Sequence, residues 1–260
     1  MDCEWLKKPE KECGIICGCD QSQEWLLPWW WERYRLSNSF PVSFADFGMS
    51  ETAKRWCREK GELFNVELEA THIKMKHEID PEAAHYWEQL YGPEVWKARQ
   101  NWFKKPFALL NSPYRHSIWI DLDCEVLNNV KDLFLACDQH SQLAMVREHK
   151  TNHLPRFHAE ARYNGGVIVA IHGAAIIEKW AEESLKRNHQ FWGDDPLLSA
   201  LIKERRLEIV ELPQIYNWRL ANGINMGAVI HHWTGTGGKA YIKQYGGIQP
   251  AIHSFNNKKY

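Results

Sequence analysis

The chain lacks an excess of charge of either sign. Its 260 residues include 32 Lys and Arg against 33 Asp and Glu, which leaves a formal net charge of −1. Proteins that hold nucleic acid by its phosphates need a basic surface, so this balance argues against a nucleic-acid partner. The hydrophobic share of 44% and charged share of 25% are ordinary for a globular protein.

Long apolar segments are also missing. The longest one, 167–177, is interrupted by His172 and Gly173 and is shorter than the roughly 20 residues that span a bilayer. The first residues include Asp2 and Glu4 and show no basic region followed by an apolar one, so no signal peptide is expected. These features predict a cytoplasmic protein without a transmembrane segment. Peripheral attachment at the inner membrane face stays open.

Cysteine is present in an odd number, seven, which does not suit the paired framework of a small secreted protein. Cys13, Cys17 and Cys19 fall in one strand-like segment without a second ligand cluster, so buried thiols are favoured over zinc ligands. The three histidines of residues 149–158 are interpreted as part of a polar loop. Tryptophan, by contrast, is abundant with fourteen copies. Most of these should be core residues, and a few are candidates for flat platforms under a sugar ring.

Short apolar segments alternate with amphipathic ones along the chain. Strands are predicted at 14–19, 41–46, 64–68, 143–147, 167–170, 207–212 and 228–232, with one more ending at Asp121. Helices are predicted at 27–36, 82–90, 93–111, 174–187 and 196–206, with one more capped by Ser50. This order favours an α/β fold with a mainly parallel sheet and helices on both faces. No repeat or linker divides the chain, so residues 1–260 are predicted to form one domain.

Acidic residues follow several of the predicted strands. Asp121 and Asp123 are two positions apart, which places both carboxylates on one face of an extended chain. Buried carboxylates are costly without a partner, and a hard divalent cation such as Mn²⁺ or Mg²⁺ suits them; a solvated turn is the alternative. Asp20 and Asp46 also end strands, where ligands bind in parallel sheets. We therefore expect these carboxylates to line one site.

Further polar segments lie later in the chain. His232 is a candidate third metal ligand or a structural histidine. The glycine-rich loop that follows it, 234–239, exposes backbone N–H groups and Lys239 to a phosphate, although it is not a Walker A sequence. Asp194 and Asp195 open a predicted helix, where they either contact substrate or stabilise the helix terminus.

The order of these segments resembles the nucleotide-sugar glycosyltransferases of the GT-A fold, in particular the retaining family-8 group that includes galactosyltransferases and glycogenin. The matching segments cover most of the chain and are 19–21, 45–50, 104–105, 119–126, 164–167, 194–198 and 232–239. Two departures stand out. Asp195 occupies a position where the family has glutamine, and the spacing from Gly235 to Lys239 is one residue longer than in the family motif.

The resemblance implies a GT-A domain whose loop-rich C-terminal part, about 207–260, completes the active site. It implies transfer of a hexose from a UDP-sugar to a glycan or glycolipid, with retention and with Mn²⁺ or Mg²⁺ as cofactor. The implied metal ligands are Asp121, Asp123 and His232. The implied catalytic residues are Asp194, Asp195 and Asn164. The implied substrate-binding residues are Asp20, Gln21, Asp46, Lys104, Lys105, Gly165, Gly166, Gly235 and Lys239.

The residues leave three other functions open. A glycoside hydrolase would use two carboxylates without a metal. A non-catalytic module would bind a nucleotide sugar without turnover, and a nucleotidyltransferase would release pyrophosphate in place of UDP. Lys104 and Lys105 have a plainer alternative of their own, as a solvated helix face.

Overall fold

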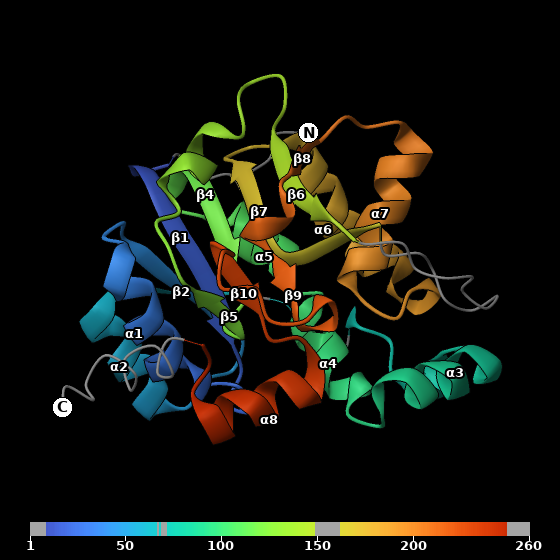
Figure 1. Ribbon diagram of the computed structural model, residues 1–260. Helices are drawn as coiled ribbons and strands as arrows, with labels where there is room; N and C mark the ends of the chain where they lie inside the picture. The colour runs from blue at the N-terminus through green and yellow to red at the C-terminus, as the bar shows by residue number, and fades with distance from the viewer. Residues whose placement is uncertain (1–8, 67, 69–71, 149–161, 249–260) are drawn as a thin grey trace.

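The computed structural model describes residues 9–66, 68, 72–148 and 162–248. Its centre is a seven-stranded sheet with helices on both faces (Figure 1). The strands of this sheet are β1 (Lys11–Cys19), β2 (Val42–Asp46), β3 (Glu62–Asn65), β4 (Tyr114–Ile120), β6 (Leu143–Arg147), β7 (Tyr163–Ile171) and β8 (Val210–Leu212). The predicted α/β fold is confirmed.

The strand order is β3-β2-β1-β4-β7-β6-β8. Only β7 runs antiparallel to its neighbours β4 and β6, and the other pairs are parallel. The carboxyl ends of six strands therefore meet at one edge of the sheet, together with the start of β7. Polar residues that follow these strands can converge there although they are far apart in sequence.

A small second sheet has the order β5-β10-β9, with β5 at Cys124–Val126, β9 at Trp218–Arg219 and β10 at Ile230–His232. β10 pairs antiparallel with β5, and His232 lies opposite Cys124 in this register. This pairing brings the C-terminal part of the chain to the segment that directly follows the Asp121 turn.

The helices are α1 (Leu26–Ser37), α2 (Glu51–Lys60), α3 (Pro81–Tyr91), α4 (Val95–Trp102), α5 (Lys105–Leu110), α6 (Ala175–Arg187), α7 (Asp194–Arg205) and α8 (Gly235–Tyr245), with short 3₁₀ turns at Lys76–Glu78, Lys131–Leu135, Asn188–Gln190, Gln214–Tyr216 and Leu220–Asn222. α1, α2 and α8 contribute buried residues to one core cluster, and α5, α6 and α7 contribute to the other. No helix in the described ranges is both long and apolar enough to cross a bilayer.

Side chains on the central strands point alternately to the two faces of the sheet, and each face has its own hydrophobic core. On β4, Ile118 and Ile120 belong to the cluster beneath α1, whereas Trp119 between them belongs to the cluster beneath α7. Successive side chains of a strand point to opposite faces, so a continuously apolar strand is buried on both sides. α3 and α4 form a third cluster of their own and extend away from the sheet (Figure 1).

Two predicted elements need correction. The single helix expected at 93–111 is two helices, and Pro106 lies in the first turn of α5, where its missing N–H costs nothing, instead of bending a longer helix. The loop expected at 234–239 is the N-terminal half of α8, and Gly238 fits because its Cα lies against the Trp233 backbone. Ser50 caps α2 as predicted, since its hydroxyl accepts from Ala53 N. The loop predicted at 149–158 lies outside the described residues.

Candidate active site

The turn after β4 carries the two carboxylates that the sequence singled out. Asp121 N donates to Gly166 O at 2.9 Å, and Cys124 N donates to Asp121 O at 3.0 Å. These backbone bonds fix a tight turn between β4 and β5. Both carboxylates are thereby held at the carboxyl edge of the sheet, the location predicted for them.

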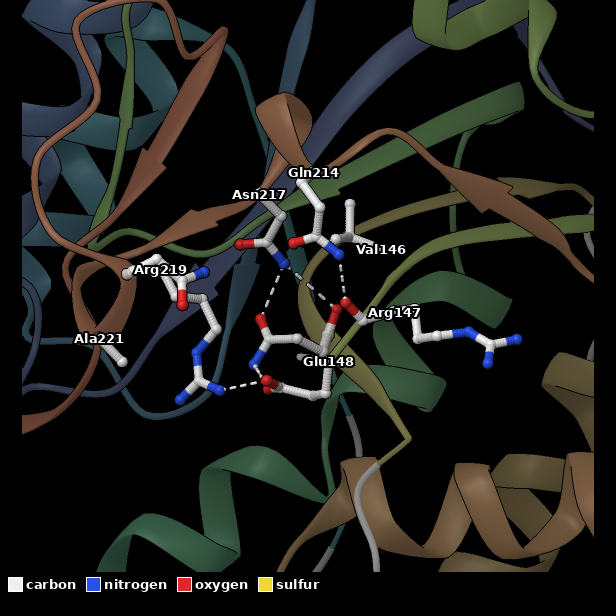
Figure 2. A pocket seen from close by; sticks show the side chains of 9 residues that line it. Val146, Arg147, Glu148, Gln214, Asn217, Arg219 and Ala221 are labelled. Atoms are coloured by element: carbon white, nitrogen blue, oxygen red, sulfur yellow. Dashed lines mark hydrogen bonds and ion pairs between the residues drawn. The ribbon is translucent and has the colours of Figure 1, made fainter. Parts of the chain in front are cut away.

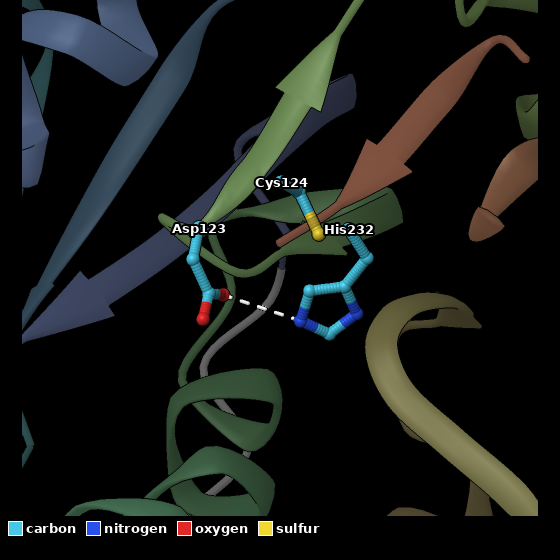
Figure 3. Close-up of side chains that lie close together, drawn as sticks. All are labelled: Asp123, Cys124 and His232. Carbon is cyan, nitrogen blue, oxygen red and sulfur yellow. Dashed lines mark ion pairs between the residues drawn. The ribbon is translucent and has the colours of Figure 1, made fainter. Parts of the chain in front are cut away.

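Asp123 is a buried carboxylate with two cationic or polar partners. Its Oδ1 lies 3.2 Å from His232 Nε2 and its Oδ2 lies 2.5 Å from Lys239 Nζ. Figure 3 shows the carboxylate facing the imidazole ring. Burial alone would raise the pKa of Asp123, but the attraction of Lys239 and His232 outweighs it and holds this pKa far below its ordinary range. Asp123 is thus ionised at neutral pH.

Asp121 faces the same space from the other side of the turn. Its Oδ1 accepts from Trp119 Nε1 at 2.6 Å, and its Oδ2 lies 4.0 Å from His232 Nε2. Among the described residues, Asp123, Cys124 and His232 each place one potential ligand atom within 4.8 Å of the other two. Burial raises the pKa of the Cys124 thiol well above its ordinary value, so the carboxylate and the imidazole are the readier donors. This donor set fits a divalent cation such as Mn²⁺.

Lys105 is a buried cation beneath three carboxylates. Its Nζ lies 3.4 Å from Asp121 Oδ1 and 3.5 Å from Asp194 Oδ2, and it donates to Gly165 O at 2.9 Å. Burial would lower the pKa of Lys105, but the neighbouring aspartates outweigh burial and raise it. The alternative interpretation of Lys105, as part of a solvated helix face, is therefore wrong.

Asp194 and Asp195 occupy the first turn of α7, and both are more than helix caps. Asp195 Oδ1 accepts from Gly165 N at 2.9 Å. Asp194 Oδ2 is buried and has no hydrogen-bond partner among the described residues. Burial, reinforced by repulsion from Asp194, raises the pKa of Asp195 to about 8, although Lys105 opposes the shift. A buried carboxyl without a full set of partners points to a ligand with hydroxyl groups.

We expect Asp195→Asn to remove a pH-dependent destabilisation. A carboxyl whose pKa is raised by folding contributes stability that is complete below its unfolded pKa near 4 and is lost as pH rises through the folded pKa near 8. The variant should therefore gain at least about 1 kcal/mol over wild type between pH 5 and pH 8. Urea unfolding in EDTA at both pH values measures this difference. If the free energy of unfolding differs between variant and wild type by the same amount at pH 5 and pH 8, the raised pKa of Asp195 is contradicted.

The glycines of the Asn164-Gly165-Gly166 segment are required by close packing. A Cβ on Gly165 would overlap the Asp195 carboxylate, and a Cβ on Gly166 would overlap the His232 ring. These glycines thus let β7 pack against Asp195 and His232. The sequence suggested two other roles for them, a close approach to a donor sugar or a turn.

Asn164 links β7 to His232 through Asn217, a residue that the sequence analysis missed. Asn217 Nδ2 donates to Asn164 Oδ1 at 2.8 Å, and Asn217 Oδ1 lies 2.9 Å from His232 Nδ1. An acceptor at Nδ1 favours the tautomer with its proton there, which leaves Nε2, on the Asp123 side, as the nitrogen that could bind a cation. Nothing in the local sequence around Asn217 signals this role, because the contact exists only in the folded chain.

The residues predicted for the nucleotide lie at the β1–β2 end of the same edge. Asp46 Oδ1 accepts from Gly48 N at 2.8 Å and Met49 N at 2.7 Å, and its Oδ2 pairs with Lys54 at 3.0 Å. Asp46 therefore orders its own loop. Asp20 Oδ1 likewise accepts from Ser22 N at 2.9 Å.

Two further predicted residues lie beside that loop. Lys104 Nζ donates to Phe47 O at 2.8 Å. Burial lowers the pKa of Lys104, while the charges of Asp20 and Asp46 oppose the shift, so this lysine lies within electrostatic reach of both carboxylates. Gln21 is exposed and donates its backbone N–H to Gly48 O at 2.9 Å. Among the described residues, no hydrogen bond or ion pair joins these side chains directly to Asp123.

Comparisons with known proteins agree with this geometry. The galactosyltransferase LgtC, solved with donor and acceptor sugar analogs, superposes with a TM-score of 0.56 at 12% identity, covering 88% of this chain and 94% of LgtC. The glycosyltransferase GlyE of Streptococcus pneumoniae TIGR4 gives a TM-score of 0.58 at 15% identity, covering 94% of this chain and 62% of GlyE. The bifunctional glycosyltransferase WbbM gives a TM-score of 0.54 at 10% identity, covering 88% of this chain and 47% of WbbM. No protein-family model and no curated protein matches the sequence.

The chain therefore has the GT-A fold of these glycosyltransferases, as its motifs indicated. The mostly parallel sheet and the acidic turn after β4 are its defining parts here.

Proposed function

We propose that this protein is a glycosyltransferase that moves a hexose from a nucleotide-diphosphate sugar, a UDP-hexose in the simplest case, to a hydroxyl of a glycan or glycolipid. The observation that carries the proposal is the buried Asp123 carboxylate between His232 Nε2 and Lys239 Nζ, at the ligand-binding edge of a GT-A sheet. An anionic ligand can use the Lys239 ammonium that now pairs with Asp123.

The diphosphate end of the donor would lie between the β4 turn and α8. Asp121, Asp123 and His232 would hold a Mn²⁺ or Mg²⁺ ion, which acts as a Lewis acid on the departing diphosphate. Lys239 would exchange its bond with Asp123 for a diphosphate oxygen, as a point charge. The start of α8 at Gly235 offers further N–H donors to the same anion.

The sugar end of the donor would lie over Lys105 and the start of β7. Asp194 Oδ2, buried without a hydrogen bond among the described residues, would accept from a sugar hydroxyl. Lys105 would position this carboxylate from below, and it opposes the rise that burial causes in the pKa of Asp194. Asp195 and Asn164 flank the same space, Asp195 on the side from which an acceptor would approach. Retention of anomeric configuration is proposed from the family resemblance.

The nucleoside would extend toward Asp20, Gln21, Asp46 and Lys104 at the β1–β2 end, and Gly165 and Gly166 would face the sugar. We also propose a cytoplasmic location, free or peripheral at the inner membrane face.

The test is a panel of sugar nucleotides screened for Mn²⁺-dependent release of UDP, with and without candidate glycans. We expect UDP release with at least one UDP-hexose and its loss in EDTA. Turnover that persists in EDTA would favour a hydrolase, and release of pyrophosphate would favour a nucleotidyltransferase. UDP binding without turnover on the whole panel would favour a non-catalytic module.

A further inference from the structure

Glu125 is a buried carboxylate that the proposed reaction does not use. It lies on β5, two residues after Asp123, and its side chain is fully buried. A buried carboxylate is costly unless polar groups surround it, so its partners show what it holds in place. Two of these partners flank α8, the helix that carries Lys239.

The first partner precedes α8. Trp233 Nε1 donates to Glu125 Oε2 at 3.0 Å, and Trp233 N donates to Asp123 O at 2.9 Å. The indole ring also stacks on Tyr241 of α8, with ring centroids 4.4 Å apart. Glu125 therefore fixes a ring against which the middle of α8 packs.

The second partner follows α8. Ile248 N donates to Glu125 Oε1 at 3.0 Å and to Oε2 at 2.8 Å. Gly247 has a φ of +92°, and a Cβ on it would overlap the Glu125 carboxylate, so glycine is required for this close approach. Figure 1 shows α8 beneath the short strands β5 and β10. One carboxylate on β5 thus holds the chain on both sides of this helix.

Helix α1 binds the same end of α8, which gives a role to part of its tryptophan-rich segment. Trp29 Nε1 and Arg33 Nη2 each donate to Gly246 O at 2.9 Å. Gly246 is the C-cap of α8. Arg33 Nε also lies 3.6 Å from Glu125 Oε1, so the guanidinium joins the helix cap to the buried carboxylate.

These contacts determine where the Lys239 ammonium lies. Its Nζ is 2.5 Å from Asp123 Oδ2. A lysine ammonium is a point charge on a flexible stem, so its position depends on the helix that carries it. Asp123 directly precedes β5, and Lys239 lies on α8. Glu125 therefore joins the two elements that support this ion pair.

The network is separate from a pocket of about 180 Å³ on the β6–β8 side of the site. The pocket is lined in part by Glu148, Asn217 and Arg219 (Figure 2), and no described residue of α1, β5 or α8 lines it. Asn164 Nδ2 donates to Glu148 Oε1 at 3.1 Å, which connects the pocket to the β7 side of the site. A change at Glu125 is therefore expected to act on the α8 side alone.

We propose that Glu125 is a positioning residue, which holds α8 so that Lys239 lies where the diphosphate of the donor binds. The inference rests on the proposed function, because it names a group of that donor. Glu125 itself touches no substrate and acts through α8 and Lys239.

The experiment measures the affinity for UDP by calorimetry in the presence of Mn²⁺. Glu125→Ala should weaken UDP binding at least about tenfold, the loss of one charge-assisted contact. In the Lys239→Met background the same change should weaken binding less than about twofold, because the group that Glu125 positions is already absent. The matched control Glu183→Ala removes another buried carboxylate with an ion pair, on α6, and should change the UDP affinity of wild type less than about twofold.

Turnover and a conservative variant give two further readouts. Glu125→Ala should raise the donor KM by about the factor lost in UDP affinity and leave the acceptor KM within about twofold of wild type. Glu125→Gln keeps the shape and one acceptor oxygen for Trp233 Nε1 and Ile248 N, so its UDP affinity should stay within about threefold of wild type. Thermal unfolding establishes that each variant is folded at the temperature of the assay.

The outcomes separate this inference from the proposed function. An equal loss from Glu125→Ala with and without Lys239 would overturn the inference, since a purely structural residue weakens binding alike in both backgrounds. An unchanged UDP affinity in Glu125→Ala would overturn it as well and leave the proposed function in place. If wild type binds no UDP, the proposed function fails and the positioning role fails with it. If Glu125→Ala does not fold, Gly247→Ala carries the same test, because its Cβ would displace the carboxylate.

Discussion

Replacing Asp123 with alanine is expected to lower metal-dependent UDP release by at least about 100-fold at saturating Mn²⁺. Asp123 is the carboxylate closest to both His232 and Lys239, at 3.2 and 2.5 Å. Under the proposed function, its removal would take away a ligand of the cation and would leave His232 and Lys239 without the carboxylate that positions them. Initial rates over a range of Mn²⁺ concentrations measure the effect.

The matched control for this change is Asp132→Ala. Asp132 is an exposed carboxylate in the 3₁₀ turn Lys131–Leu135, on the same stretch of chain but outside the site. Its rate should stay within about twofold of wild type. Thermal unfolding of both variants separates lost chemistry from lost folding. A rate for Asp123→Ala close to that of wild type under saturating metal would refute the assignment of this carboxylate.

Lys105→Met is expected to destabilise the protein by about 3–5 kcal/mol, the cost of breaking a buried ion pair. The change removes the cation that neutralises Asp121 and Asp194 and breaks its bond to Gly165 O. The buried Asp194 and the partly exposed Asp121 then lose the cation that lies between them. Urea unfolding at pH 7 in EDTA measures the loss, and UDP release should fall as well, because Lys105 positions the sugar-side carboxylate.

The adjacent lysine provides the control. Lys104→Met removes a half-buried ammonium that donates to Phe47 O, and its cost should be smaller than that of Lys105→Met by at least about 2 kcal/mol. Adding Asp194→Asn to Lys105→Met should recover part of the lost stability, since it removes one of the unpaired charges. Equal costs for the two lysine variants, or no recovery in the double variant, would show that Lys105 does not neutralise this cluster.

The fold was predictable because its signals are local. The structure has β1, β2 and β4 where the sequence shows apolar segments that end in aspartate. It has α2 and α7 where the sequence shows helical segments that begin near Ser50 and Asp194. The two errors have a common origin. Pro106 and the glycines of 234–239 are helix breakers in isolation, but proline is favoured in a first turn, and Gly238 is required where α8 packs on the Trp233 backbone.

The site was only partly predictable. The rule that ligands bind at the carboxyl ends of strands selected Asp20, Asp46 and Asp121, and the same rule applied to β6 would have selected Glu148. It gave no ranking among them. In the folded chain Asp46 orders its own loop by accepting from Gly48 N and Met49 N. Asp121 instead lies 3.4 Å from Lys105 Nζ.

By itself, the sequence determined that Asp20, Asp46 and Asp121 follow strands at the carboxyl edge of the sheet, because strand periodicity and turn chemistry act over a few neighbouring residues. Only the tertiary structure decided how these residues are paired. The contacts of Lys105 with Asp194, and of Asn217 with His232, join segments that are distant along the chain. Charge state and proton position depend on burial and on such partners. These exist only once the sheet has brought the strand ends together.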